Sequence, residues 1–224
     1  MLREEKIGLI QSAIMGVVER REREKDIRRK QILAAAEKVF VAKGFSGATM
    51  EDIAQEAELS PATLYLYFKN KEELYTYLNL RMLRYVSAKL EHLQKRDGLS
   101  PEQKLEALKG VFYNIYKFDP LSLINIFHFQ ASNGLKNLSP ELLSEIQLFS
   151  AKSLRMIAKI FEEGIAQGVF IDRHPTALAD VVWSTFGGIV LWEESKTKLN
   201  PRKKYLKKTL DLAFEVFLNS VKKK

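Results

Sequence analysis

Proline marks the start of helix after helix along this chain. The six prolines follow a residue able to cap a helix, or a histidine, at Ser60-Pro61, Ser100-Pro101, Asp119-Pro120, Ser139-Pro140, His174-Pro175 and Asn200-Pro201. Proline is tolerated at the first helical position, and serine, aspartate or asparagine before it satisfies free backbone N–H groups. Only His174 departs from that set of caps. The apolar residues between these starts repeat at helical spacing, and no strand alternation is convincing. The sequence therefore predicts an all-α fold.

The capping, proline and glycine signals predict nine helices after an N-terminal leader. Their approximate limits are 26–43, 49–57, 60–68, 70–96, 100–118, 119–133, 139–164 or 168, 174–194 and 200–221. Gly44 occupies a C-terminal glycine position after the first of them. Residues 1–25 form a leader with an apolar stripe followed by a charged run. This leader either continues as a helix into the next element or is mobile, and Met15 is an alternative start.

Residues 49–68 have the pattern of a helix-turn-helix. Thr49 is a good N-cap, and Asp52 three residues later makes a capping-box-like pair with it. A three-residue turn, 58–60, leads to the second helix, in which Leu64 and Phe68 are predicted to point into the core. The residues predicted to face outward are Pro61, Ala62, Thr63, Tyr65 and Tyr67. A short helix with small residues at its start suits insertion into the major groove of DNA.

The net charge of +8 does not by itself indicate a nucleic-acid partner. Residues 196–224 hold ten basic and two acidic side chains, so the whole excess lies in this tail, whereas residues 26–72 hold seven of each sign. If this segment binds DNA, attraction depends on placement of single cations. We expect Arg28, Arg29, Lys69 and Lys71 toward phosphates. In the leader, Arg20, Arg21, Arg23 and Lys25 are further candidates for phosphate or minor-groove contacts, although glutamates are interleaved with them.

Composition excludes several classes of site. There is no cysteine, which removes disulfides, thiolate metal sites and cysteine nucleophiles. His92, His128 and His174 lie far apart without metal-ligand spacing, and there is no Gly-rich phosphate loop or nucleophile elbow. We therefore expect no catalytic residues, no metal and no cofactor. The apolar run 9–18 is too short to cross a bilayer, so a cytoplasmic protein without membrane contact is predicted.

The segment from Ile32 to Leu74 strongly resembles the DNA-binding domain of the tetracycline-repressor (TetR) family of bacterial regulators. The resemblance rests on Ile32-Leu-Ala-Ala-Ala-Glu-Lys-Val-Phe40, Gly44-Phe45, Thr49 to Ala57, Ser60 to Phe68 and Lys71-Glu-Glu-Leu74. After the leader (1–25), it implies a DNA-binding domain (26–74) and a helical ligand-binding and dimerisation domain (75–224). It also implies a homodimer that binds a palindromic double-stranded operator, as a repressor released by a small-molecule effector.

The resemblance also assigns DNA contacts position by position. Thr49 corresponds to the family's phosphate-contacting cap, and Lys71 to the phosphate-binding lysine that opens the fourth helix. The start and outward face of the third helix correspond to Ser60, Pro61, Ala62, Thr63, Tyr65 and Tyr67. Leu66 departs from the polar or aromatic residue of many relatives. Base readout is then expected from Thr63, Tyr65 and apolar contacts such as that of Ala62 with a thymine methyl.

The C-terminal part carries two further predictions. The helices at 174–194 and 200–221 are more apolar than one exposed face requires, and the family's habit makes them half of a four-helix dimer interface. The interface residues predicted are Trp183, Phe186, Gly187, Val190, Leu210, Phe214 and Phe217. The central helices are rich in aromatic residues, which suits an apolar or aromatic effector. The candidate ligand contacts are Tyr85, Tyr113, Tyr116, Phe127, His128 and Trp183, and plain core packing is the alternative for each.

A second function remains open at this point. A helix-turn-helix can survive in an interaction protein that no longer binds a specific operator, and the balanced charge of residues 1–195 is compatible with that class. The salt dependence of DNA affinity separates the two. An activator, or a regulator without an effector, is also compatible with this sequence.

Overall fold

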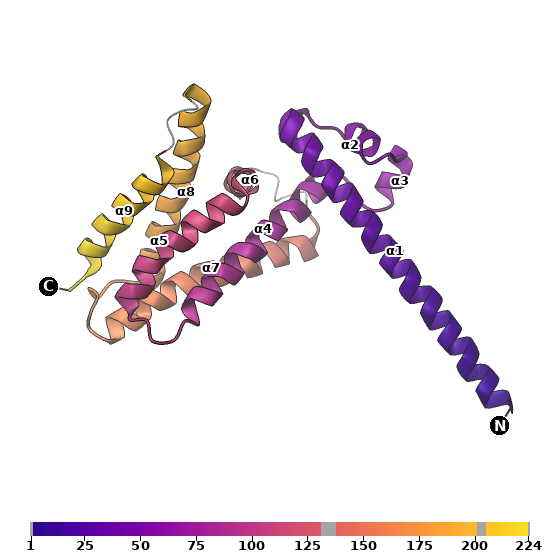
Figure 1. Cartoon of the computed structure of the whole chain (residues 1–224), viewed down its shortest axis with the longest axis horizontal. Coiled ribbons are helices and arrows are strands. Elements are labelled where there is room, and N and C mark those ends of the chain that lie inside the picture. Colours follow the sequence, from indigo (N-terminus) through magenta and orange to yellow (C-terminus); the bar gives the residue numbers. More distant parts are fainter. Residues whose placement is uncertain (1, 131–137, 201–204, 224) are drawn as a thin grey trace. The chain divides into compact units, whose positions relative to one another are not determined.

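The structure of the chain is a computed structural model that describes residues 2–130, 138–200 and 205–223. In these ranges the chain forms nine α-helices, and the extended pairing there is a single bridge between Phe170 and Lys222 (Figure 1). The all-α prediction is confirmed. The chain divides into two compact units, Met1–Tyr77 and Leu78–Lys224.

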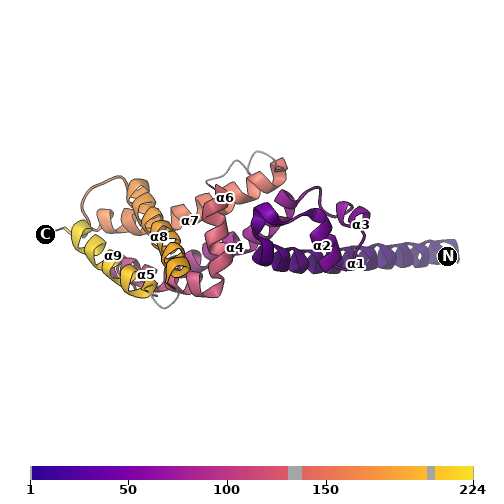
Figure 2. The ribbon, with the colours of Figure 1, turned by 90° about the horizontal axis from the view of Figure 1, so that it is seen from above.

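The first unit contains α1 (Leu2–Gly47), α2 (Met50–Glu56), α3 (Pro61–Tyr65) and the first turns of α4 (Lys71–Gln94). Of the two alternatives for the leader, the structure has the continuous helix, because α1 keeps helical geometry from Leu2 as far as Gly44. Figures 1 and 2 show the N-terminal half of α1 continuing past α2 and α3. Gly44 interrupts α1 with φ 68° and ψ 168°, a conformation essentially restricted to glycine.

The core of the first unit is the one that the helical spacing predicts. Ile32, Ala36, Val39 and Phe40 of α1 are buried, as are Ile53, Ala54, Leu64 and Phe68, and α1 packs on α2. Aromatic rings close the core, since Tyr75 packs edge-on against Phe40 at 5.2 Å between ring centres. The guanidinium of Arg29 lies over the rings of Phe68 (4.7 Å) and Tyr77 (4.8 Å), and this cation–π contact ties α1 to α4.

The second unit contains the rest of α4, followed by α5 (Pro101–Phe118), α6 (Pro120–Gln130), α7 (Pro140–Ala166), α8 (Pro175–Leu199) and α9 (Leu206–Val221). Four of these helices, α5 to α8, begin at their predicted proline, as α3 does in the first unit. The predicted start at Pro201 lies outside the described residues. His174 does cap α8, because its Nδ1 accepts a hydrogen bond from the Ala177 N–H at 3.4 Å.

A cluster of rings from α5, α6, α8 and α9 forms the core of the second unit. Phe112 stacks on Phe186 with 4.2 Å between ring centres and meets Phe214 edge-on at 5.8 Å. Phe127 packs on Trp183 at 5.8 Å and on Phe186 at 6.2 Å. These contacts fix which sides of α8 and α9 face inward.

Candidate nucleic-acid interface

Thr49 and Asp52 fix the start of α2. The Thr49 hydroxyl accepts a hydrogen bond from the Asp52 N–H (3.1 Å), and the Asp52 carboxylate accepts one from the Thr49 N–H (3.2 Å), which is the predicted capping box. Hydrogen bonds from Lys43, 2.7 Å away, and from Thr49 hold the pKa of the Asp52 carboxyl below its usual value. Thr49 is exposed, and a hydroxyl that accepts one bond can still donate its own proton, for example to a phosphate.

Ser60 and Thr63 form a second hydroxyl pair at the start of α3. The Ser60 hydroxyl accepts from the Thr63 N–H at 3.1 Å, and the two side-chain oxygens lie 2.8 Å apart. One hydroxyl donates to the other, so the pair keeps one proton for an outside acceptor such as a phosphate or a base edge. Ser60 is exposed and Thr63 half-buried.

The outward face of α3 is mostly apolar. Pro61 and Ala62 are exposed, and Tyr65 is 49% exposed. Leu64 and Phe68, predicted to point inward, are 0% and 1% exposed. α3 ends at Tyr65, so the half-buried Tyr67 lies beyond the helix, after the 81% exposed Leu66. The turn before α3 contains Glu58 at φ 55°, a left-handed conformation that is costly for a residue with a side chain.

Two of the four cations expected to point at phosphates have partners inside the first unit. The Lys71 ammonium donates to the carbonyl oxygens of Phe45 and Ala48, both at 3.0 Å, so the structure gives it a role in joining α4 to the end of α1. Arg29 lies over the two aromatic rings described above. The sequence prediction missed both roles because the partners are distant along the chain. A phosphate contact by Lys71 stays a prediction.

Comparison with known proteins decides the family. A family model for the C-terminal region of QacR-like proteins matches residues 102–223, more than half of the chain, and a model for bacterial regulatory proteins of the tetR family matches residues 32–78. The chain belongs to the TetR family. TetR-family proteins are DNA-binding transcriptional regulators and not enzymes, so this chain is a transcriptional regulator that binds DNA through its helix-turn-helix.

Individual TetR-family relatives are similar over most of their length. The transcriptional repressor NicS of Pseudomonas putida is 28% identical over 155 residues, which cover 68% of this chain and 70% of NicS. QacR of Staphylococcus aureus is 23% identical over 199 residues, 86% of this chain and 97% of QacR. The crystal structure of a TetR-family regulator from Rhodococcus RHA1 has a TM-score of 0.69 at 22% identity, covering 87% of this chain and 96% of its own.

The predicted effector contacts of this TetR-family chain have different neighbours in the structure, and their role in binding stays a prediction. Phe127 and Trp183 are in contact, but Tyr85 stacks on Phe118 at 3.9 Å. Tyr116 lies on α5, where burial and then Glu193 and Tyr113 raise its pKa. The side chain of His128 lies outside the described part of the chain. Trp183 lines a cavity of about 230 Å³ in the second unit, together with Leu83, Ser150, Ala151, Ser153, Leu154 and Asp180.

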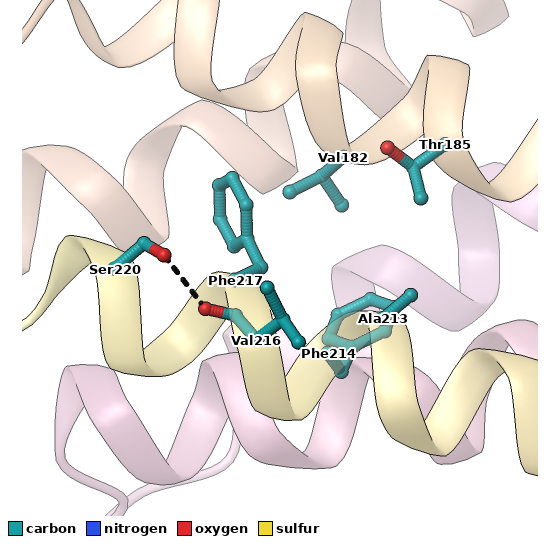
Figure 3. Close-up of a pocket in the computed structure, with 7 residues that line it drawn as sticks. All are labelled: Val182, Thr185, Ala213, Phe214, Val216, Phe217 and Ser220. Atoms are coloured by element: carbon teal, nitrogen blue, oxygen red, sulfur yellow. Dashed lines mark hydrogen bonds between the residues drawn. The ribbon is translucent and has the colours of Figure 1, made fainter.

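The residues predicted for the dimer interface lie mostly inside the subunit. Phe186, Val190, Leu210 and Phe214 are 0–4% exposed, and Gly187 is buried where an added Cβ would lie 3.0 Å from the Phe127 ring. The large apolar side chains that these helices expose include Val181, Trp192 and Leu199 on α8 and Leu212 and Val216 on α9. Phe214 and Phe217 of the predicted set line a hollow of about 350 Å³ between α8 and α9, with Val182, Thr185, Ala213, Val216 and Ser220 (Figure 3).

In the described part of the chain, no group of three or more histidine and carboxylate side chains could hold a metal ion. No helix described there combines the length and the apolar character needed to cross a bilayer.

Proposed function

We propose that this regulator is a repressor that binds a palindromic operator as a homodimer and leaves it when a small effector binds the second unit. The observation that carries the proposal is the start of α3, where Ser60 and Thr63 offer a hydroxyl proton beside the exposed Ala62 and Tyr65. Such a surface offers one donor and apolar contacts to base edges in a major groove. The repressor activity named for NicS supports the proposed sign of regulation.

The test for operator binding is selection of bound sequences from a random duplex pool by the full-length protein. We expect a palindrome with half-sites about one helical turn apart. Two variants test the contact surface of α3. Thr63→Val removes a hydroxyl and leaves a side chain of nearly the same shape, and Tyr65→Ala removes an exposed ring. Each should weaken operator binding by about 1–3 kcal/mol with little change in thermal stability. Recovery of no consensus would favour the interaction-protein class.

The proposed dimer uses the exposed apolar face of α8 and α9. Val181 is 50% exposed and Trp192 61% on α8, and Leu212 (60%) and Val216 (57%) continue the apolar surface on α9. Val181→Glu and Val216→Glu should convert the dimer to monomer in light scattering after size exclusion. Leu148→Glu on α7 is the matched control, since Leu148 is also 60% exposed but lies elsewhere. A wild-type monomer would contradict this part of the proposal.

The proposed effector site is the 230 Å³ cavity lined by Leu83, Leu154 and Trp183. The Ser150 hydroxyl is buried there without a hydrogen-bond partner among the described residues, which favours a small apolar or aromatic molecule that carries one polar group. The chain has two tryptophans, so Trp192→Phe leaves Trp183 as the reporter. We expect aromatic alcohols or acids that release DNA to change the Trp183 fluorescence, and Leu83→Phe, which places a larger side chain in the cavity, to weaken both effects.

A further inference from the structure

A basic groove runs along α1 beside the end of α3. It has a volume of about 590 Å³, and its lining includes Arg21, Lys25 and Arg28 of α1 together with Leu66 and Tyr67. The three cations are spaced i, i+4 and i+7, which places them on one face of a helix. All three are exposed. Figures 1 and 2 show α3 beside the stretch from which α1 continues toward its N-terminal end.

Arg20 and Arg23, the other arginines of the leader, differ from the three groove cations because each has an acidic partner. Arg20 pairs with Glu24 at 2.9 Å, and Arg23 lies 3.9 Å from Glu19. Among the described side chains, none comes within ion-pair distance of the three groove cations. Four other cations of the first unit also have partners. Lys38 and Lys43 form ion pairs with Glu56 and Asp52. Lys71 donates to carbonyl oxygens, and Arg29 lies over two aromatic rings.

The zero net charge of residues 26–72 does not describe the charge of the groove. Residues 26–72 contain equal numbers of acidic and basic side chains, but Glu56 and Asp52 are held by lysines away from the groove. The groove itself is positive, because its lining has three cations and one acidic side chain, and Arg21 and Lys25 lie outside the balanced segment. Glu24 also lines the groove, and its pairing with Arg20 compensates its charge.

We infer that Arg21, Lys25 and Arg28 bind the sugar–phosphate backbone of the DNA next to the segment that α3 contacts. This inference rests on the proposed operator binding. Seven residues of helix extend about 10 Å, which equals the rise of about three nucleotides along the duplex axis. Tyr67 belongs both to the outward residues of the motif and to the groove, so the two surfaces are continuous.

The test compares salt dependence, because each phosphate contact contributes about 0.9 to the slope of log affinity against log salt. The triple variant Arg21→Gln, Lys25→Gln, Arg28→Gln removes three charges with a residue that favours helices. We expect its slope to be shallower by about 2–3, with the selected operator sequence unchanged. The control, Arg23→Gln with Lys38→Gln, alters two cations of the same helix that pair with Glu19 and Glu56, and it should change the slope much less.

A triple variant with the wild-type slope, or one that changes no more than the control, would overturn the inference. Circular dichroism and thermal melting establish that both variants keep the wild-type fold. If the wild-type protein selects no operator, the proposed function fails. The slopes are then compared on a duplex of random sequence, where the same difference still decides for or against the groove.

Discussion

The ammonium nitrogen of Lys71 lies 3.0 Å from the carbonyl oxygen of Phe45 and 4.8 Å from the centre of the Phe45 ring. Its second carbonyl partner, Ala48, lies in the segment between α1 and α2. One side chain at the start of α4 thus satisfies backbone acceptors around the end of α1. The Lys71 side chain therefore holds the start of α4 against the end of α1, next to the helix-turn-helix.

Lys71→Met should therefore lower the stability of the protein as well as any DNA affinity. The apolar stem stays, but two partly buried carbonyl groups lose their donor, which costs about 1–3 kcal/mol. Denaturant unfolding measures the change, with the exposed Lys69→Met as the matched control. Unchanged stability with weakened operator binding would instead support the phosphate contact implied by the family resemblance.

Glu58→Gly should stabilise the protein. Glu58 has φ 55°. Glycine removes the steric cost of this conformation but raises the conformational entropy of the unfolded chain, so we expect the free energy of unfolding to rise by up to about 1 kcal/mol. The control is Gln55→Gly in α2, an exposed helical position where glycine should destabilise by up to about 1 kcal/mol. Melting temperatures that fall equally in both variants would contradict the prediction.

Lys104→Met should destabilise the second unit. The Lys104 side chain is 10% exposed and its ammonium lies 2.7 Å from the Glu163 carboxylate, which also accepts a 2.6 Å hydrogen bond from Gln94. Removing the cation leaves a partly buried carboxylate without its counter-charge, at a cost of about 2–3 kcal/mol. Adding Glu163→Met should recover much of the loss in denaturant unfolding. A double variant as unstable as the sum of both single variants would argue against the ion pair.

Glu91 should make stability depend on acid pH. Hydrogen bonds from Lys152 and Lys95 lower the pKa of its carboxyl from 4.5 to about 2. Because the pKa is lower in the folded state, the stabilisation is present above pH 4.5 and is lost as pH falls toward 2. Glu91→Gln should melt below wild type at pH 7, and the difference should vanish near pH 2. A difference that is independent of pH would point to altered packing instead of lost charge.

The sequence was sufficient where a structure depends on neighbours along the chain. The capping box of Thr49 with Asp52, the cap at Ser60 and five helix starts at proline are local arrangements, and the structure has each of them. The same holds for Leu64 and Phe68, whose spacing of four residues sets one buried face. The position of Pro201 lies in the segment that the structure does not describe.

The sequence was insufficient where two faces of a helix are equally apolar. On α8, Phe186 is buried and Val181 exposed, yet periodicity cannot tell which apolar face meets the core of the subunit. The partners of Lys71 and Arg29 were missed for a related reason, because backbone carbonyls and rings distant along the chain leave no mark in local spacing. The cavity around Ser150 likewise requires three helices to be placed together.

Gly44 has open space around it, but its backbone conformation restricts which residues can replace it. A Cβ atom built there would have no neighbour within 4 Å, but φ is 68° and ψ is 168°. A mutational scan judged by side-chain contacts would rank this position among the most permissive of the first unit. The backbone makes the opposite ranking correct, since a larger residue would be strained by about 1–3 kcal/mol. Tolerance to change at the end of α1 is therefore set by dihedral angles and not by space.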